Sequence, residues 1–220
     1  MPPAAAAAAV PTLGYMDARG IAEPIRCLLH YCNVNFNDKR YPDKAAWLRE
    51  KHALGLPFPN LPYAGVKLTQ TTAVLQHIGR EQGLVGKSPA QVAEIDMLTH
   101  VALDMANGLI CLCYSTPDQY HENLPNFIKQ IPTWLDPLDA YLGTKDWFAG
   151  ELSTADFVLY DRLSVFNAFQ PGCVDSHASL KGFMERFRGL KVVSEYLASP
   201  EHMTRRVFGP ESNWNFCEQN

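Results

Sequence analysis

The fold of this chain is decided by the stretch Thr12-Leu13-Gly14-Tyr15-Met16-Asp17-Ala18-Arg19-Gly20. Its first four residues are typical of a short β-strand, and glycines interrupt the pattern before a helix begins. Apolar residues then recur at helical spacing, at Ile21, Ile25, Leu28, Leu29 and Cys32. The stretch therefore predicts a strand that ends at Tyr15 and leads into an amphipathic helix.

The segment that follows predicts three further strands and a second helix. Residues 36–41 favour a strand, and residues 60–64 and 66–70 favour two short strands joined by a turn at Gly65. Residues 73–80 favour a helix. This order is typical of an α/β, thioredoxin-like domain, which we assign to residues 11–82, with residues 83–87 as a linker.

Beyond the linker the pattern is helical throughout, so we expect an all-α domain over residues 88–220. A long apolar stripe extends from Ile95 to Leu112, and helical patterns cover residues 128–142, 154–166 and 180–197. Pro137 lies inside one of these patterns and predicts a kink or a later helix start. Ser153-Thr154-Ala155-Asp156 has the form of a capping box at the start of another.

Composition excludes several classes of function. Among 220 residues, Lys and Arg number 19 against 23 Asp and Glu, and this net charge of −4 argues against nucleic-acid binding. No apolar run approaches the length of a membrane span. The six cysteines form no C-x-x-C pair and the seven histidines no H-x-x-x-H, so we expect reduced thiols and no metal site. Residues 1–10 predict a disordered Ala/Pro tail, which lacks the basic start of a signal peptide.

Four segments, in this order and spacing, resemble the cytosolic glutathione transferases and are most similar to the mu class. They surround Tyr15, Phe58-Pro59-Asn60-Leu61-Pro62-Tyr63, Gln70-Thr71-Thr72 and Ser153-Thr154-Ala155-Asp156-Phe157. The resemblance implies a cytoplasmic homodimer, with Phe58 as an apolar contact to the partner. It also implies that reduced glutathione is a co-substrate, conjugated to small hydrophobic electrophiles in detoxification, and that no cofactor is bound.

The resemblance gives roles to individual residues. Tyr15 would be catalytic, because its hydroxyl would donate a hydrogen bond to the sulfur of glutathione. The residues implied to bind glutathione are Tyr15, Met16, Arg40, Trp47, Lys51, Asn60, Leu61, Pro62, Gln70, Thr71 and, from the neighbouring subunit, Asp104. The proline before the third strand is cis in thioredoxin-like folds. The residues implied to hold the hydrophobic substrate are Ala18, Ile21, Ile110, Tyr114 and Phe208.

Taken alone, these residues also have ordinary structural interpretations. A tyrosine at a strand end is usually a packing residue, and a threonine that starts a helix is usually an N-cap. Two other functions use the same fold: a non-enzymatic carrier of hydrophobic ligands and a glutathione-dependent isomerase. The chain also departs from the mu pattern, because Met16 replaces a tryptophan and the 41–47 and 63–67 segments are short. These departures predict a more open site.

Overall fold

The computed structural model describes residues 10–214, 216 and 217, and the predicted N-terminal tail lies almost entirely outside them. A four-stranded sheet forms first, in the order β2-β1-β3-β4. β1 (Thr12–Met16) is parallel to β2 (Asn37–Tyr41) and antiparallel to β3 (Tyr63–Ala64), which pairs with β4 (Leu68–Thr69). Tyr15 lies opposite Arg40 in this register.

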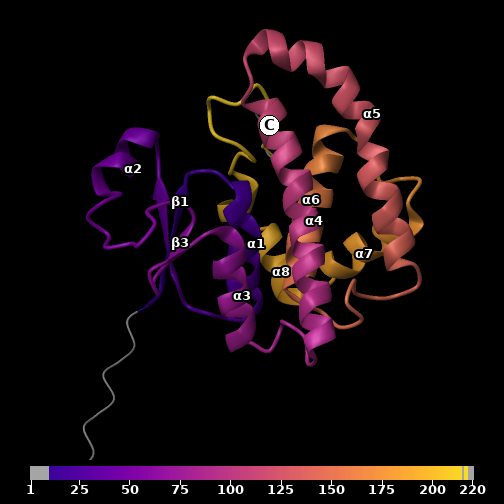
Figure 1. Ribbon diagram of the computed structural model, residues 1–220, viewed down its shortest axis with the longest axis horizontal. Helices are drawn as coiled ribbons and strands as arrows, with labels where there is room; N and C mark the ends of the chain where they lie inside the picture. The colour runs from indigo at the N-terminus through magenta and orange to yellow at the C-terminus, as the bar shows by residue number, and fades with distance from the viewer. Residues whose placement is uncertain (1–9, 215, 218–220) are drawn as a thin grey trace, which may run out of the picture.

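Three helices accompany the sheet. α1 (Glu23–Tyr31) follows the 3-10 turn η1 (Gly20–Ala22), and α3 (Thr71–Glu81) follows β4. α2 (Lys44–Glu50) lies on the other side of the sheet from α1 and α3 (Figure 1). No helix was predicted after Tyr41, yet α2 begins there, and Asp43 caps it by accepting from the Ala46 amide at 2.7 Å.

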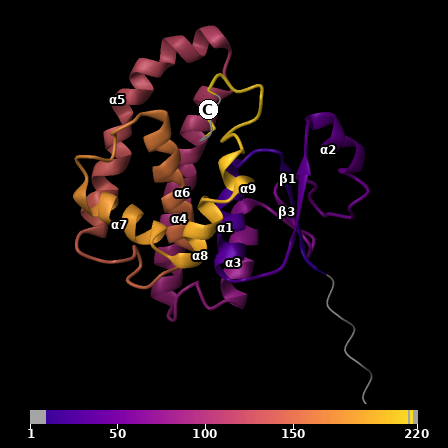
Figure 2. The same ribbon diagram turned by 180° about the vertical axis from the view of Figure 1, so that it is seen from behind.

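The remainder is helical, as predicted, and packs against α1 and α3 (Figures 1 and 2). Its helices are α4 (Pro89–Cys113), α5 (Pro117–Leu142), α6 (Thr154–Phe169), α7 (Ala178–Arg188), α8 (Lys191–Leu197) and α9 (Pro200–Met203). The pattern over 180–197 is two helices rather than one, since α7 ends at Arg188 with Gly189 as its C-cap. The main core joins both halves of the chain, and α6, with 11 of its 16 residues buried, lies at its centre.

α5 is longer than the sequence predicts. It starts eleven residues before Ile128, behind a capping box in which Thr116 and Gln119 exchange hydrogen bonds. It continues through Pro125, Pro132 and Pro137, all of them exposed. Because these prolines face solvent, water can bind the carbonyls that they leave unpaired. Figure 1 shows α5 curving around the other helices, as interior prolines cause helices to do.

The predicted capping box at the start of α6 is present. The Ser153 amide and hydroxyl both donate to Asp156 Oδ2, at 2.8 and 3.0 Å. Burial raises the pKa of Asp156 to about 6, although hydrogen bonds from Phe148 and Ser153 oppose that rise. The Thr154 amide also donates to the carbonyl of Leu84 at 2.9 Å, which ties α6 to the segment between the two halves.

α4 differs from the expectation that no apolar segment is long enough to span a membrane. By length and composition α4 could cross a bilayer, since its most apolar stretch has a mean hydropathy of 1.3. In this fold, 44% of that stretch is buried inside the protein. Ile95, Leu98, Ala102, Met105 and Leu109 all lie in the main core, so the stripe serves as the buried face of a core helix.

Candidate active site

Tyr15 lies at the end of β1, where the chain turns into α1. Gly20 has a φ of +50°, and a Cβ there would lie 2.6 Å from the Tyr15 hydroxyl oxygen. The position therefore requires glycine both for its backbone conformation and for the close approach of the ring. The Ile21 amide donates a long hydrogen bond, 3.4 Å, to the Tyr15 hydroxyl. Because the oxygen accepts this bond, the hydroxyl proton is free to be donated elsewhere.

The electrostatic surroundings keep the Tyr15 hydroxyl protonated. Burial raises its pKa above the ordinary value for tyrosine. The Ile21 amide and the positive charges of Arg26 and Arg162 lower it in part. Tyr15 is therefore a hydrogen-bond donor at neutral pH.

A cavity of about 470 Å³ opens beside Tyr15. Its walls come from the first half of the chain, from α4 and from the C-terminal segment. The lining residues are Tyr15, Met16, Ala18, Gly20, Lys44, Ile110, Tyr114, Val207, Phe208, Gly209 and Glu211. Four of the five residues predicted to hold a hydrophobic substrate are thus brought together with Tyr15. The fifth, Ile21, is not among the described residues of the lining and instead contacts Tyr15 through its backbone.

Tyr114 is the second hydroxyl in this cavity. It accepts a 2.8 Å hydrogen bond from the Gly209 amide, and its ring meets that of Phe208 edge to face at 5.8 Å. Burial raises the pKa of Tyr114, and the Gly209 amide opposes that rise. Asn213 holds the C-terminal segment in place by donating to the carbonyls of Cys113 and Ser115. The C-terminal segment is therefore held over the end of α4.

Three of the residues predicted to bind glutathione lie in or around a second, smaller apolar cluster. Trp47 is buried there, edge-on to Tyr41 and stacked with Tyr63. Met16 and Leu61 pack against the same cluster. The Leu61–Pro62 peptide bond is cis. Trp47 thus supports the segments that carry Met16 and Leu61.

Gln70 and Thr71 form the N-terminus of α3. Gln70 has a φ of +77°, which is uncommon for a residue other than glycine. The Thr71 side chain is buried, and its hydroxyl has no hydrogen-bond partner among the described residues. A buried polar atom without a partner calls for an explanation, and a bound ligand supplies one. The free amides of the first turn attract anions to the same place.

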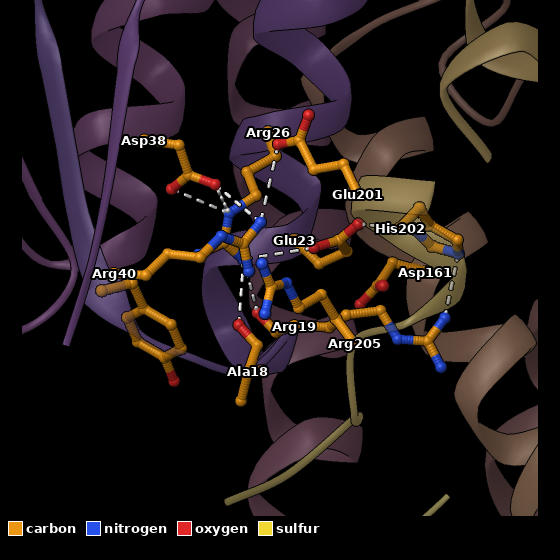
Figure 3. A network of polar contacts seen from close by, with 12 residues as sticks. Ala18, Arg19, Glu23, Arg26, Asp38, Arg40, Asp161, Glu201, His202 and Arg205 are labelled. Carbon is orange, nitrogen blue, oxygen red and sulfur yellow. Dashed lines mark hydrogen bonds and ion pairs between the residues drawn. The ribbon is translucent and has the colours of Figure 1, made fainter. Parts of the chain in front are cut away.

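The remaining predicted residues lie apart from the cavity. Arg40 forms ion pairs with Asp38 at 2.6 Å and with Glu201 at 3.6 Å, in the polar network of Figure 3. Lys51 follows the end of α2, and Asn60 is exposed next to Leu61. Asp104 is exposed on α4. Asp17 lies 3.9 Å from the same guanidinium, so three carboxylates already balance the charge of Arg40 in this protomer.

Sequence reasoning missed several residues of the site. Lys44, Val207, Gly209 and Glu211 line the cavity, yet no motif marks them. Arg26 and Arg162 were also missed, although each interrupts an apolar helical pattern, which is a readable sign of a buried charge. Over residues 10–214, 216 and 217, no group of three or more His, Cys, Asp or Glu could hold a metal ion.

A small mixed sheet with a tyrosine at the end of its first strand, joined to a helical half, is the architecture of the glutathione S-transferases to which this chain is similar. Comparison with known proteins gives the same result. Residues 103–200 match the family model "Glutathione S-transferase, C-terminal domain". Mouse glutathione S-transferase Mu 2 and human glutathione S-transferase Mu 5 are each 38% identical to this chain over 215 residues, covering 93% of it and 98% of each relative.

Two solved structures of glutathione S-transferases are also similar to this chain. The crystal structure of the glutathione S-transferase Blo t 8 is similar with a TM-score of 0.86 and 31% identity, covering 93% of this chain and 100% of that one. The structure of the pi-class glutathione S-transferase of Onchocerca volvulus is similar with a TM-score of 0.83 and 25% identity, covering 92% of this chain and 99% of that one. The chain belongs to the glutathione S-transferase family and is a transferase, with curated relatives of the mu class.

Proposed function

We propose that this enzyme conjugates reduced glutathione to small hydrophobic electrophiles. The observation that carries the proposal is the geometry of Tyr15. Its oxygen accepts from the Ile21 amide, and its proton is available at the wall of a cavity whose other residues are largely apolar. A thiolate at that position would receive the proton of the hydroxyl as a hydrogen bond.

The reaction follows from this placement. The sulfur of glutathione loses its proton to solvent water, and the Tyr15 hydroxyl stabilises the resulting thiolate. Since a free thiol has a pKa of about 8.5, each unit of lowering requires about 1.4 kcal/mol of preference for the thiolate. The thiolate attacks the electrophilic carbon, a carbon–sulfur bond forms, and the leaving group departs with the electrons of the bond that breaks. Tyr114, whose oxygen is also engaged by a backbone amide, can donate its proton to the electrophile.

We assign the two ends of glutathione from the same arguments. The Thr71 hydroxyl, which has no partner in the described part of the chain, and the first turn of α3 suit the γ-glutamyl carboxylate, and the Leu61 backbone suits the cysteinyl unit. Met16, Pro62 and Gln70 belong to the same part of the proposed site, and Asn60 is a proposed contact for the glycine end. Lys51, Trp47 and Arg40 remain proposed contacts for the glycine end, and Arg40 would exchange part of its pairing with Asp38 and Glu201 to bind it.

We further propose a cytoplasmic homodimer. Phe58 is 79% exposed on this protomer, an unusual state for a phenylalanine, and a partner subunit would cover it. Asp104, exposed on α4, would reach the γ-glutamyl amine bound in the partner.

The test is a conjugation assay with an aryl halide, after capture of the protein on immobilised glutathione. We expect the wild type to bind glutathione and to conjugate it to the aryl halide. Tyr15→Phe should bind glutathione but conjugate it much more slowly. The control Tyr120→Phe, which changes a tyrosine on α5, should behave as the wild type. Binding without turnover by the wild type would contradict conjugation and favour a carrier. Turnover only of an unsaturated ketone whose double bond migrates would favour an isomerase.

A further inference from the structure

Two arginines are almost fully buried next to Tyr15. Arg26, on α1, is 0% exposed and Arg162, on α6, is 2% exposed. Burying a guanidinium is costly unless other groups compensate it, so such residues usually have a defined task. Neither residue lines the described cavity beside Tyr15. Any effect of theirs on the reaction must therefore pass through other groups.

Arg26 fixes the turn that follows Tyr15. Its Nη1 donates to the carbonyls of Ala18 and Arg19 at 3.1 and 3.2 Å, and its Nε donates to both oxygens of Asp38 (Figure 3). Its guanidinium carbon lies 5.8 Å from the centre of the Tyr15 ring. The same residue therefore holds the turn and places a positive charge against the ring.

Arg162 continues this pattern from the helical half of the chain. Its Nη2 donates to the carbonyl of Gly20 at 3.1 Å. Three consecutive carbonyls, those of Ala18, Arg19 and Gly20, thus accept from two buried arginines. The Nε of Arg162 has no hydrogen-bond partner among the described residues, while its Nη2 also pairs with Asp161. Among the described residues, the carbonyl of Gly20 and the carboxylate of Asp161 are therefore the hydrogen-bonding partners of this guanidinium.

The Gly20 carbonyl belongs to the same peptide unit as the Ile21 amide. That amide donates to the Tyr15 hydroxyl. A cation at the carbonyl end of a peptide draws electron density toward the oxygen and makes the N–H a stronger donor, because hydrogen bonds in a chain polarise one another. A stronger bond to the hydroxyl oxygen in turn makes the hydroxyl proton a better donor. The chain of contacts is Arg162, the Gly20–Ile21 peptide, Tyr15 and then the bound sulfur.

We propose that Arg162 is a positioning residue which, through the Gly20–Ile21 peptide, strengthens the hydrogen bond from Tyr15 to the glutathione thiolate. This inference rests on the proposed conjugation of glutathione. Arg26 holds the rest of the same turn, and Asp161 partly balances the charge of Arg162.

Apart from Arg162, the titratable groups that face the same hydroxyl stay unchanged in the test. Tyr15 faces Arg26 from α1, Arg162 from α6 and Tyr114 from the C-cap position after α4. Arg162 itself faces Asp161 on α6, and Glu23 and Arg19 from the first half of the chain. Burial lowers the pKa of Arg162 to about 10, so the guanidinium stays charged throughout the range in which a thiol titrates.

The experiment compares Arg162→Met, Arg162→Gln and Arg162→Lys with the wild type. Methionine removes both the charge and the hydrogen bond, glutamine keeps a neutral donor, and lysine keeps the charge. The control is Arg188→Met, the same change at an exposed arginine that contacts α6 through Tyr160. Each protein is titrated by the ultraviolet absorbance of glutathione bound to it, and kcat and KM are measured with an aryl halide from pH 6 to 9.

We expect the bound thiol of Arg162→Met to titrate at higher pH, with kcat about three- to tenfold lower at pH 6.5 and a KM for glutathione within about twofold of the wild type. The loss should shrink toward pH 9, where the thiol ionises without help. Arg162→Lys should recover part of it, Arg162→Gln less, and Arg188→Met should match the wild type.

A folded Arg162→Met with an unchanged thiol titration would overturn the proposal. If Arg162→Met does not fold, Arg162→Lys and Arg162→Gln are compared instead. The proposal is then overturned if the bound thiol has the same pKa in both variants and in the wild type. A wild type that forms no thiolate would instead refute the proposed function, so the two failures are distinguishable.

Discussion

Arg162 and Tyr15 contact opposite ends of one peptide unit, the one that joins Gly20 to Ile21. Arg162 donates to its carbonyl at 3.1 Å, and its amide donates to the Tyr15 hydroxyl at 3.4 Å. The two residues are 147 positions apart in the sequence and belong to different halves of the fold. The proposed catalytic tyrosine is therefore positioned jointly by the sheet that carries it and by the central helix of the other half.

Gly20→Ala should reduce activity by moving the Tyr15 ring. The positive φ costs an alanine about 1–2 kcal/mol, and its Cβ would also overlap the ring. Gly83→Ala is the matched control, because Gly83 has a φ of +71° with no described atom within 4 Å of an added Cβ. We expect both variants to lose thermal stability, measured by calorimetry, with the larger loss in Gly20→Ala because of the added overlap, and only Gly20→Ala to lose turnover. Full activity in Gly20→Ala would show that the close contact has no bearing on the reaction.

Glu23 should make the fold sensitive to acid. Burial alone would raise its pKa, but the hydrogen bond from His202, the charge of Arg26 and the Tyr196 hydroxyl together hold that pKa well below its usual range. A carboxylate with a lowered pKa in the folded state stabilises the fold above its unfolded value of about 4.3 and loses that contribution as the pH falls below it.

We therefore expect Glu23→Gln to lower the free energy of unfolding by about 3 kcal/mol at pH 7, because a buried charge loses its partner. The difference from the wild type, measured by urea denaturation, should shrink below about pH 4. Glu81→Gln is the control, since Glu81 is exposed and pairs with His77 at the protein surface. A difference that stays constant down to pH 3 would contradict the role given to Glu23.

Phe58→Ser should shift the protein toward the monomer and weaken glutathione binding at the same time, because Asp104 would then be lost from the neighbouring site. Sedimentation across a concentration series measures the first effect, and calorimetric titration with glutathione measures the second. Val66→Ser, at an exposed apolar residue in the turn between β3 and β4, is the control. A monomeric wild type would refute both parts.

The order of the elements could be predicted from the sequence, because strand alternation, helical periodicity and the capping box at Ser153 are local signals. The thioredoxin-like first half, the helical second half and the family resemblance are confirmed. α2 was missed because only Trp47 of its residues is buried, which leaves no apolar stripe to detect. The break at Gly189 and the long start of α5 were missed because tertiary packing, rather than periodicity, sets where those helices end.

Only part of the candidate site could be predicted from the sequence. Tyr15, Ala18, Ile110, Tyr114 and Phe208 came from the resemblance, and the fold gathers them around one cavity. Arg162 could not be predicted in its role, because its contact with Gly20 joins residues 142 positions apart. The ion pair of Arg40 with Glu201 was equally hidden, since it depends on Glu201 reaching β2 from α9. Such relationships appear only once the two halves are packed together.

The most direct test of the account is the pKa of the thiol of glutathione bound to the wild type and to Tyr15→Phe, measured by ultraviolet difference titration. We expect a wild-type pKa at least one unit below the free value of about 8.5, and a value near the free one in Tyr15→Phe. Turnover should fall by about one to three orders of magnitude, or roughly 1.4–4 kcal/mol in the barrier, while glutathione still binds. The same thiol pKa in both proteins would contradict the central claim that the Tyr15 hydroxyl stabilises the thiolate.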